Sequence, residues 1–211
     1  MTERSAIILA AGQGTRMKSK RAKVLFEVCG RPILHHVIHA ALGAGIRDVF
    51  VVVGFDGENV TRSLSGFGDR VRTVVQSEQK GTGHAVGCAL PALPEGQGTT
   101  LVLCGDTPLL EPEDLEPLAR DLPAEASLAR LTCNVPDPTG YGRILRDREG
   151  RVVAIRETTL YAPRIIRRVM GAPSLLAVEA GQMRLAQSFS LFETMLNETS
   201  TVFLCGRCDD R

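Results

Sequence analysis

Short apolar runs alternate with segments of mixed character along the first two thirds of the chain. The runs at 5–11, 48–54, 71–76, 99–106 and 127–135 are rich in Val, Ile, Leu and Ala. A short continuous apolar run is typical of a strand that is buried on both faces of a sheet. We therefore predict a strand at each of these places.

The segments between these runs have helical spacing. At 32–45 apolar residues recur three and four positions apart and glycines follow, which predicts a helix with a defined end. Weaker helical patterns cover 58–67, 81–93 and 111–122, and the last has acidic residues early and an arginine late, as the helix dipole favours. Strands that alternate with helices in this way predict an α/β, Rossmann-like fold, with a mainly parallel sheet and helices on both faces.

The pattern changes after Pro136. The segment 141–157 predicts a hairpin of two short strands around the turn "DREG". Beyond about residue 158 no clean period is present, although 190–198 is compatible with a helix and 201–205 with a strand. These elements would form a small β-rich lobe beside the sheet.

Composition limits the classes of protein that the chain can belong to. It has 211 residues, of which 44% are hydrophobic and 23% charged, and its formal net charge is +1. This balance does not indicate a nucleic-acid or membrane-surface partner. No apolar run reaches the roughly 18 residues that a membrane span needs, and the first residues do not match a signal peptide, so we expect a cytoplasmic protein.

The loop "LAAGQGTRM" (9–17) follows the first predicted strand. It is not a dinucleotide fingerprint, because Met17 stands where GxGxxG needs its third glycine, and it is not a P-loop. Basic residues follow closely, among them Arg16 and Lys23. Backbone amides with this many cations can hold a polyphosphate, although an ordinary solvated basic loop explains the pattern equally well.

Polar groups also follow two of the other predicted strands. Asp106, at the end of 99–106, can bind Mg²⁺ or merely cap a turn. Gln76 and Gln79, before the glycines of "KGTGHAV", can bond to a base edge or a sugar, whereas His84 is more often structural at such a position. Because ligands bind beyond the carboxyl ends of parallel strands, these loops should meet at one edge of the sheet.

The blocks "AIILAAGQGTRMKSKRAKVLFEVCGRPILHHVI", "QSEQKGTGHAV", "GDTPLL" and "GYGRI…VVAIRE" together resemble the pyrophosphorylase domain of N-acetylglucosamine-1-phosphate uridylyltransferases. They keep that family's order over residues 5–157. The resemblance implies a nucleotidyltransferase that makes UDP-N-acetylglucosamine, a peptidoglycan precursor, and pyrophosphate from UTP and N-acetylglucosamine 1-phosphate.

The resemblance also assigns roles to individual residues. It implies that Arg16 and Lys23 neutralise the triphosphate and that Asp106 binds Mg²⁺. It implies that the acetamido sugar is held by Gly140 and Glu157. The positions that it assigns to the nucleotide are Ala11, Gly12, Gly14, Gln76, Gly81 and Thr82.

The chain departs from the family pattern in a few places. Ala22 replaces the proline that usually precedes the lysine, and Met170 and Leu185 fall where the family has asparagines. We therefore divide the chain into a nucleotidyltransferase core at 1–157 and a diverged or truncated acceptor lobe at 158–211. No hexapeptide repeat is present, so we expect no β-helix acetyltransferase domain, and a monomer is the default.

Three activities remain compatible with these residues. The first is Mg²⁺-dependent uridylyl transfer, at a full or an impaired rate. The second is nucleotidyl transfer to another sugar 1-phosphate or from another nucleoside triphosphate. The third is a nucleotide-binding or truncated chain without catalysis. Loss of turnover in an Asp106→Ala variant separates the first two from the third.

Overall fold

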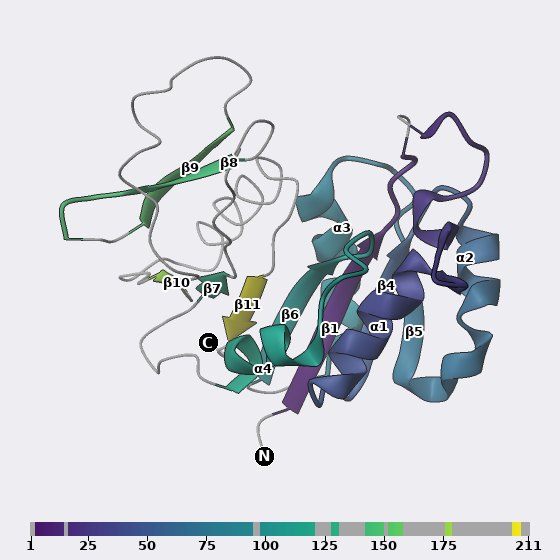
Figure 1. Ribbon diagram of the computed structural model, residues 1–211, viewed down its shortest axis with the longest axis horizontal. Helices are drawn as coiled ribbons and strands as arrows, with labels where there is room; N and C mark the ends of the chain where they lie inside the picture. Colours follow the sequence, from purple (N-terminus) through teal and green to yellow (C-terminus); the bar gives the residue numbers. More distant parts are fainter. Residues whose placement is uncertain are drawn as a thin grey trace.

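A computed structural model describes residues 3–14, 17–94, 98–120, 128–130, 142–149, 152–157, 176–178 and 204–207. Its main element is a seven-stranded sheet with the order β10-β7-β11-β6-β1-β4-β5 (Figure 1). The strands of this sheet are β1 (Glu3–Ala10), β4 (Asp48–Val53), β5 (Val71–Val75), β6 (Gly98–Cys104), β7 (Leu128–Arg130), β10 (Leu176–Val178) and β11 (Leu204–Arg207).

The four strands β6, β1, β4 and β5 run parallel to one another. Ile7 of β1 lies opposite Phe50 of β4 on one side and Val102 of β6 on the other. β11 pairs antiparallel with both β6 and β7, so it joins the parallel part to the strands beyond it. The predicted parallel α/β sheet is therefore confirmed, with an antiparallel extension at one side.

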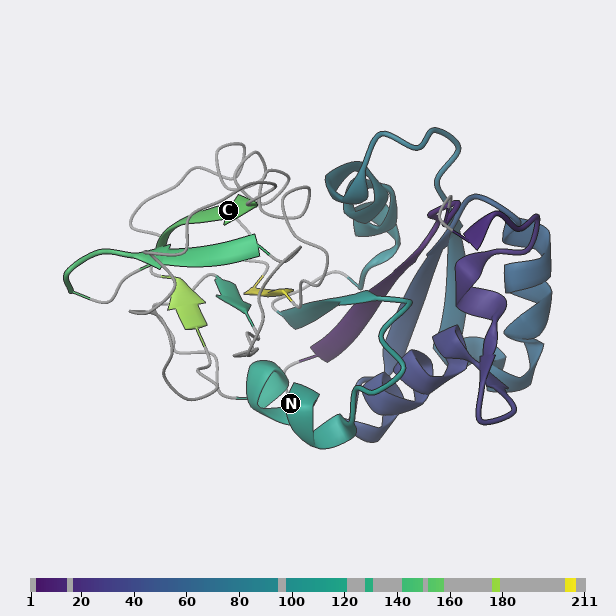
Figure 2. The ribbon, with the colours of Figure 1, turned by 45° about the horizontal axis from the view of Figure 1, so that its top comes forward.

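Helices cover both faces of the sheet, as Figures 1 and 2 show together. One face carries α1 (Ile33–Gly43), α2 (Gly57–Ser63) and α4 (Pro112–Arg120), and the other carries α3 (Thr82–Ala89). Two cores result from the alternation of side chains along each strand. Ile8 packs with the α1 and α4 side chains, whereas its neighbour Ile7 packs with Val86 of α3.

The smaller elements complete the fold. Two short hairpins are formed by β2 (Glu27–Val28) with β3 (Arg31–Pro32) and by β8 (Gly142–Arg146) with β9 (Val152–Glu157), and the second confirms the hairpin predicted around "DREG". Three 3₁₀ turns are η2 (Lys23–Leu25), η3 (Ser65–Arg70) and η4 (Leu90–Ala92). The helix expected at 190–198 lies outside the described residues. Within the described parts of the chain no helix is long and apolar enough to cross a membrane.

Candidate active site

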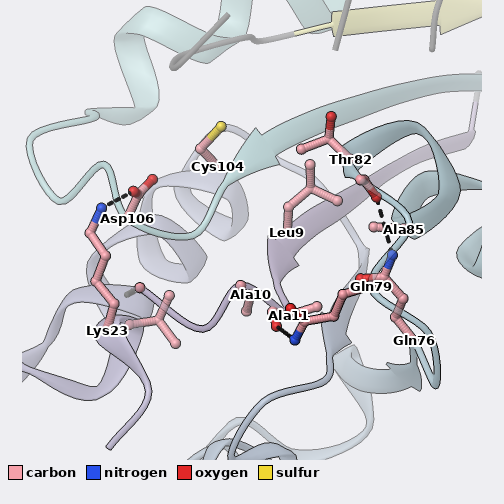
Figure 3. A pocket seen from close by; sticks show the side chains of 14 residues that line it. Leu9, Ala10, Ala11, Lys23, Gln76, Gln79, Thr82, Ala85, Cys104 and Asp106 are labelled. Carbon is pink, nitrogen blue, oxygen red and sulfur yellow. Dashed lines mark hydrogen bonds and ion pairs between the residues drawn. The ribbon is translucent and has the colours of Figure 1, made fainter. Parts of the chain in front are cut away.

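A cavity of about 440 Å³ opens at the carboxyl edge of the parallel strands (Figure 3). The ends of β1 and β6, the loop after β5, the start of α3 and the turn η2 all contribute to its wall. Its lining residues are Leu9, Ala10, Ala11, Gly12, Gly14, Lys23, Val24, Gln76, Gln79, Gly81, Thr82, Ala85, Cys104 and Asp106.

One end of the cavity is charged. Lys23 begins η2 and Asp106 follows β6, and the lysine Nζ lies 2.5 Å from the Asp106 Oδ2. The Asp106 side chain is 33% exposed, so its carboxylate is accessible to a ligand. No group of three or more potential metal ligands occurs among the described residues. A single carboxylate suits Mg²⁺, which often takes one or two protein ligands and completes its shell with phosphate oxygens and water.

Gly14 lies against the base of the Lys23 side chain. Its φ of +59° lies in the left-handed region, where a side chain is strained. A Cβ atom at this position would also lie 2.9 Å from the Cβ of Lys23. Only glycine therefore permits the loop to turn this closely against the base of the lysine, and the Gly14 carbonyl then accepts a 2.8 Å hydrogen bond from the Met17 amide.

The opposite end of the cavity carries two glutamine side chains. Gln76 is only 5% exposed, and its amide Nε2 lies 3.1 Å from the carbonyl oxygen of Gly81 and 3.0 Å from Nδ1 of His84. Gln79 Nε2 donates a 2.9 Å hydrogen bond to the Ala11 carbonyl. The two glutamines thus connect the loop after β5 to neighbouring elements, Gln76 to the start of α3 and Gln79 to the residue after β1.

Between the two ends of the cavity, the backbone at Gly105 lies close to the backbone at Leu9. A Cβ atom at Gly105 would lie 2.8 Å from the Leu9 carbonyl oxygen. The Gly105 amide donates a 3.0 Å hydrogen bond to that same oxygen. Glycine at this position allows the chain after β6 to stay against β1, which brings Asp106 to the cavity.

The structure brings together most of the residues singled out in the sequence. The predicted residues that line the cavity are Ala11, Gly12, Gly14, Lys23, Gln76, Gly81, Thr82 and Asp106. Arg16 and Gly140 lie outside the described residues. Glu157 ends β9, which belongs to a separate two-stranded sheet and not to the cavity wall described here.

Two residues outside the predicted set support the site. His84, for which the sequence favours a structural role, contacts the buried Gln76 amide through its ring. Asp56 drew no attention, although its Oδ2 accepts a 2.9 Å hydrogen bond from the Ala22 amide, immediately before Lys23. The "DG" pair at 56–57 was the available signal, since such pairs mark turns.

A Rossmann-like sheet whose carboxyl edge holds a lysine, a carboxylate and glycine-rich loops defines the class of nucleotide-binding α/β proteins. The family model for the MobA-like NTP transferase domain matches residues 6–183, and the chain belongs to this family. Among curated proteins it is 55% identical over 162 residues to the bifunctional protein GlmU of Sorangium cellulosum, and 46% identical over 158 residues to that of Bacillus subtilis. These matches confirm the resemblance that the sequence blocks indicated.

The matches cover 74% of this chain and 34% of each GlmU protein, so the chain spans about a third of the length of these curated relatives. Solved structures support the fold. A nucleotidyl transferase from Methanothermobacter thermautotroptrophicus matches with a TM-score of 0.55 at 23% identity, over 69% of this chain and 66% of that one. HddC from Yersinia pseudotuberculosis, complexed with GMP-PN, matches with a TM-score of 0.57 at 19% identity, over 83% and 73%.

Proposed function

We propose that this chain transfers a uridylyl group from UTP to N-acetylglucosamine 1-phosphate, releasing pyrophosphate and forming UDP-N-acetylglucosamine. The observation that carries the proposal is the single cavity that joins the Lys23–Asp106 pair to the Gln76, Gly81 and Thr82 group. The identity to GlmU proteins over three quarters of the chain supports it.

The two ends of the cavity suit the two ends of a nucleotide (Figure 3). The base lies by Gln76, Gly81 and Thr82, where amide groups can bond to its edge. The triphosphate extends past Ala11 and Gly12 toward Lys23 and Asp106. Lys23 carries the positive charge that the phosphates need, and the small residues between the ends allow close approach to the backbone.

The reaction needs charge neutralisation and positioning more than proton transfer. An oxygen of the sugar 1-phosphate attacks the α-phosphorus of UTP, and the bond from that phosphorus to the pyrophosphate oxygen breaks. The attacking phosphate is already an anionic nucleophile, so no general base is required. Lys23, with Arg16 from the glycine-rich loop before it, stabilises the charge on the triphosphate and the leaving pyrophosphate.

Asp106 is the residue that would hold Mg²⁺. The carboxylate at the end of β6 fits a hard cation that shares its remaining ligands with phosphate oxygens. When bound, the ion would supply further positive charge at the phosphates. In the structure this carboxylate forms an ion pair with Lys23.

The remaining assignments belong to the same proposal. Gly140 and Glu157 hold the acetamido sugar, residues 1–157 form the catalytic core, and 158–211 form the rest of the acceptor lobe. The chain acts as a monomer in the cytoplasm, where UTP is available, and its partners are its small-molecule substrates.

The test is release of pyrophosphate by the purified chain with Mg²⁺ and N-acetylglucosamine 1-phosphate, offered each nucleoside triphosphate in turn. Release with UTP alone supports the proposal. Release with another triphosphate or another sugar 1-phosphate would assign a different nucleotidyl transfer. No release under any combination would reject catalysis by this chain.

A further inference from the structure

We propose that His84 is a positioning residue for nucleobase selection, because it fixes the direction in which the Gln76 amide faces. The proposal rests on the proposed function, since it takes the Gln76 end of the cavity as the base site. It assigns to His84 a task that the reaction itself does not require.

The amide of Gln76 is held at one atom by two acceptors. Its Nε2 lies 3.1 Å from the Gly81 carbonyl oxygen and 3.0 Å from His84 Nδ1. Figure 3 shows the first of these bonds crossing from the loop after β5 to the start of α3. The side chain is 5% exposed, so water cannot replace either partner freely.

These contacts determine the protons on both side chains. The Gly81 carbonyl can only accept, so the amide nitrogen and not the oxygen must face it. The same nitrogen then donates its second hydrogen to His84, which requires Nδ1 to be without a proton. In this arrangement the ring hydrogen of His84 is carried by Nε2.

One consequence concerns what the amide can offer a ligand. Both hydrogens of the Gln76 amide are already donated, so the carbonyl Oε1 is its remaining polar atom. An acceptor that faces the N3 position of the base favours a pyrimidine that carries a hydrogen there. Uracil has a hydrogen on N3, whereas N3 of cytosine has none and is itself an acceptor. A reversed amide would offer the opposite chemistry and would lose this discrimination.

The ring of His84 has packing contacts besides the one with Gln76. It lies in the first turn of α3 and is half-buried, and Cys88 Sγ, one turn later, is 4.0 Å from both ring nitrogens. The Gly81 bond alone restrains one hydrogen of the amide. The bond to His84 restrains the second hydrogen. In the reversed orientation the amide oxygen would face two acceptors, the Gly81 carbonyl and His84 Nδ1, and neither of these two hydrogen bonds could form.

The test compares His84→Asn with His84→Gln. The Asn Oδ1 is attached to Cγ, as Nδ1 is in histidine, so it keeps an acceptor for Gln76. In His84→Gln the side-chain oxygen is one bond farther from the backbone, so it corresponds to Nε2 of histidine and not to Nδ1. Binding of UTP and of CTP, with Mg²⁺ and without sugar phosphate, is measured by calorimetry for both variants. His39→Gln on α1 is the distant control, since His39 packs against Phe67 and does not line the cavity.

We expect His84→Gln to weaken UTP binding and to reduce the preference for UTP over CTP, each on the order of tenfold, as loss of one hydrogen bond would do. His84→Asn should stay within about threefold of the unsubstituted chain, and the effect should appear in KM for UTP more than in kcat. Equal behaviour of the two variants, or an unchanged UTP preference in His84→Gln, would overturn the proposal. Because binding needs no turnover, a chain that prefers UTP but releases no pyrophosphate would reject the proposed function alone.

Discussion

Lys23 Nζ and Asp106 Oδ2 are 2.5 Å apart at the charged end of the cavity. The lysine comes from the turn after the glycine-rich loop and the aspartate from the end of β6, 83 positions later in the chain. In the proposed reaction each side chain has another partner, the lysine a phosphate and the carboxylate a metal ion. Substrate binding would therefore exchange this ion pair for two new interactions.

Asp106→Asn should abolish Mg²⁺-dependent turnover, with kcat lowered by at least about a hundredfold, because a charge that acts on the transferring phosphoryl group is lost. Stability should change little. The two side chains are 42% and 33% exposed, and a pair this exposed contributes less than about 1 kcal/mol. Pyrophosphate release and thermal unfolding measure the two effects.

Asp48→Asn is the matched control for that substitution. Asp48 also forms an ion pair, with Arg72, but it begins β4 and so lies at the opposite edge of the sheet. This variant should keep its activity. Activity retained in Asp106→Asn would remove the carboxylate from the mechanism.

Gly14→Ala should lower both stability and activity. An alanine here would have a strained backbone φ of +59°. Its Cβ would lie 2.9 Å from the Cβ of Lys23, so the loop must shift. We expect a loss of about 1–2 kcal/mol in the free energy of unfolding, and a lower kcat because Lys23 moves. Denaturant titration and pyrophosphate release measure these changes.

Gly66→Ala provides the comparison. Gly66 has no atom within 4 Å of an added Cβ and no positive φ. The free energy of unfolding of the Gly66→Ala variant should stay within about 0.5 kcal/mol of that of the unsubstituted chain. If Gly14→Ala left the free energy of unfolding and kcat equally unchanged, glycine at position 14 would not be needed to position Lys23.

Local patterns predicted much of this fold. The strands β1, β4 and β6 are mostly buried apolar runs, β5 is a valine-rich run of which only Val71 is buried, and α1 has a clear helical period that ends at glycines. The site followed from one topological rule, that loops at the carboxyl ends of parallel strands converge. This rule predicts that the loop after β1, the loop after Gln76 and the turn at Asp106 meet at one edge, whereas the role of Lys23 came from the family resemblance.

The contacts that support the site could not be predicted in this way. The pairing of β11 with β6 and β7 joins segments about 75 to 100 positions apart, and no local period encodes such a choice of neighbour. The bond from Ala22 to Asp56 spans 34 positions. His84 has a helical position that is compatible with an ordinary structural residue, and only the fold places Gln76 beside it.

The histidines of α1 predict a pH-dependent stability. Burial lowers the pKa of His35 below its ordinary value of 6.5, and the nearby His39 lowers it further. The pKa of His39 is also lowered, first by burial and then by Arg31 and His36. As pH falls through 6.5, the unfolded chain therefore takes up protons before the folded chain does, and the folded state loses stability.

The free energy of unfolding should thus decrease between pH 7.5 and pH 5.5. The contribution of the two histidines should be less than about 1 kcal/mol, because both rings keep contact with water. Denaturant titration at the two pH values measures it. In a variant with glutamine at both His35 and His39, the free energy of unfolding should change less between the two pH values. An unchanged difference would assign the pH dependence to other groups.

The Asp56–Ala22 hydrogen bond predicts a coupled pair of substitutions. Asp56 Oδ2 lies 2.9 Å from the Ala22 amide nitrogen, and its Oδ1 accepts a 2.6 Å bond from Asn59. Ala22 is fully buried and has a φ of −57°, a value that proline also adopts. Asp56→Ala should lower the free energy of unfolding by about 2 kcal/mol, since a hydrogen bond to a charged group is lost.

Ala22→Pro removes the amide hydrogen while keeping the backbone angle of the turn before Lys23. In the Ala22→Pro variant, Asp56→Ala should lower the free energy of unfolding clearly less than it does in the unsubstituted chain, because the hydrogen bond that it breaks is already absent. The two single variants and the double variant are compared by denaturant titration, and by kcat as a measure of the position of Lys23. Costs that simply add would mean that Asp56 acts through Asn59 and its own turn, and that the segment before Lys23 is held by other contacts.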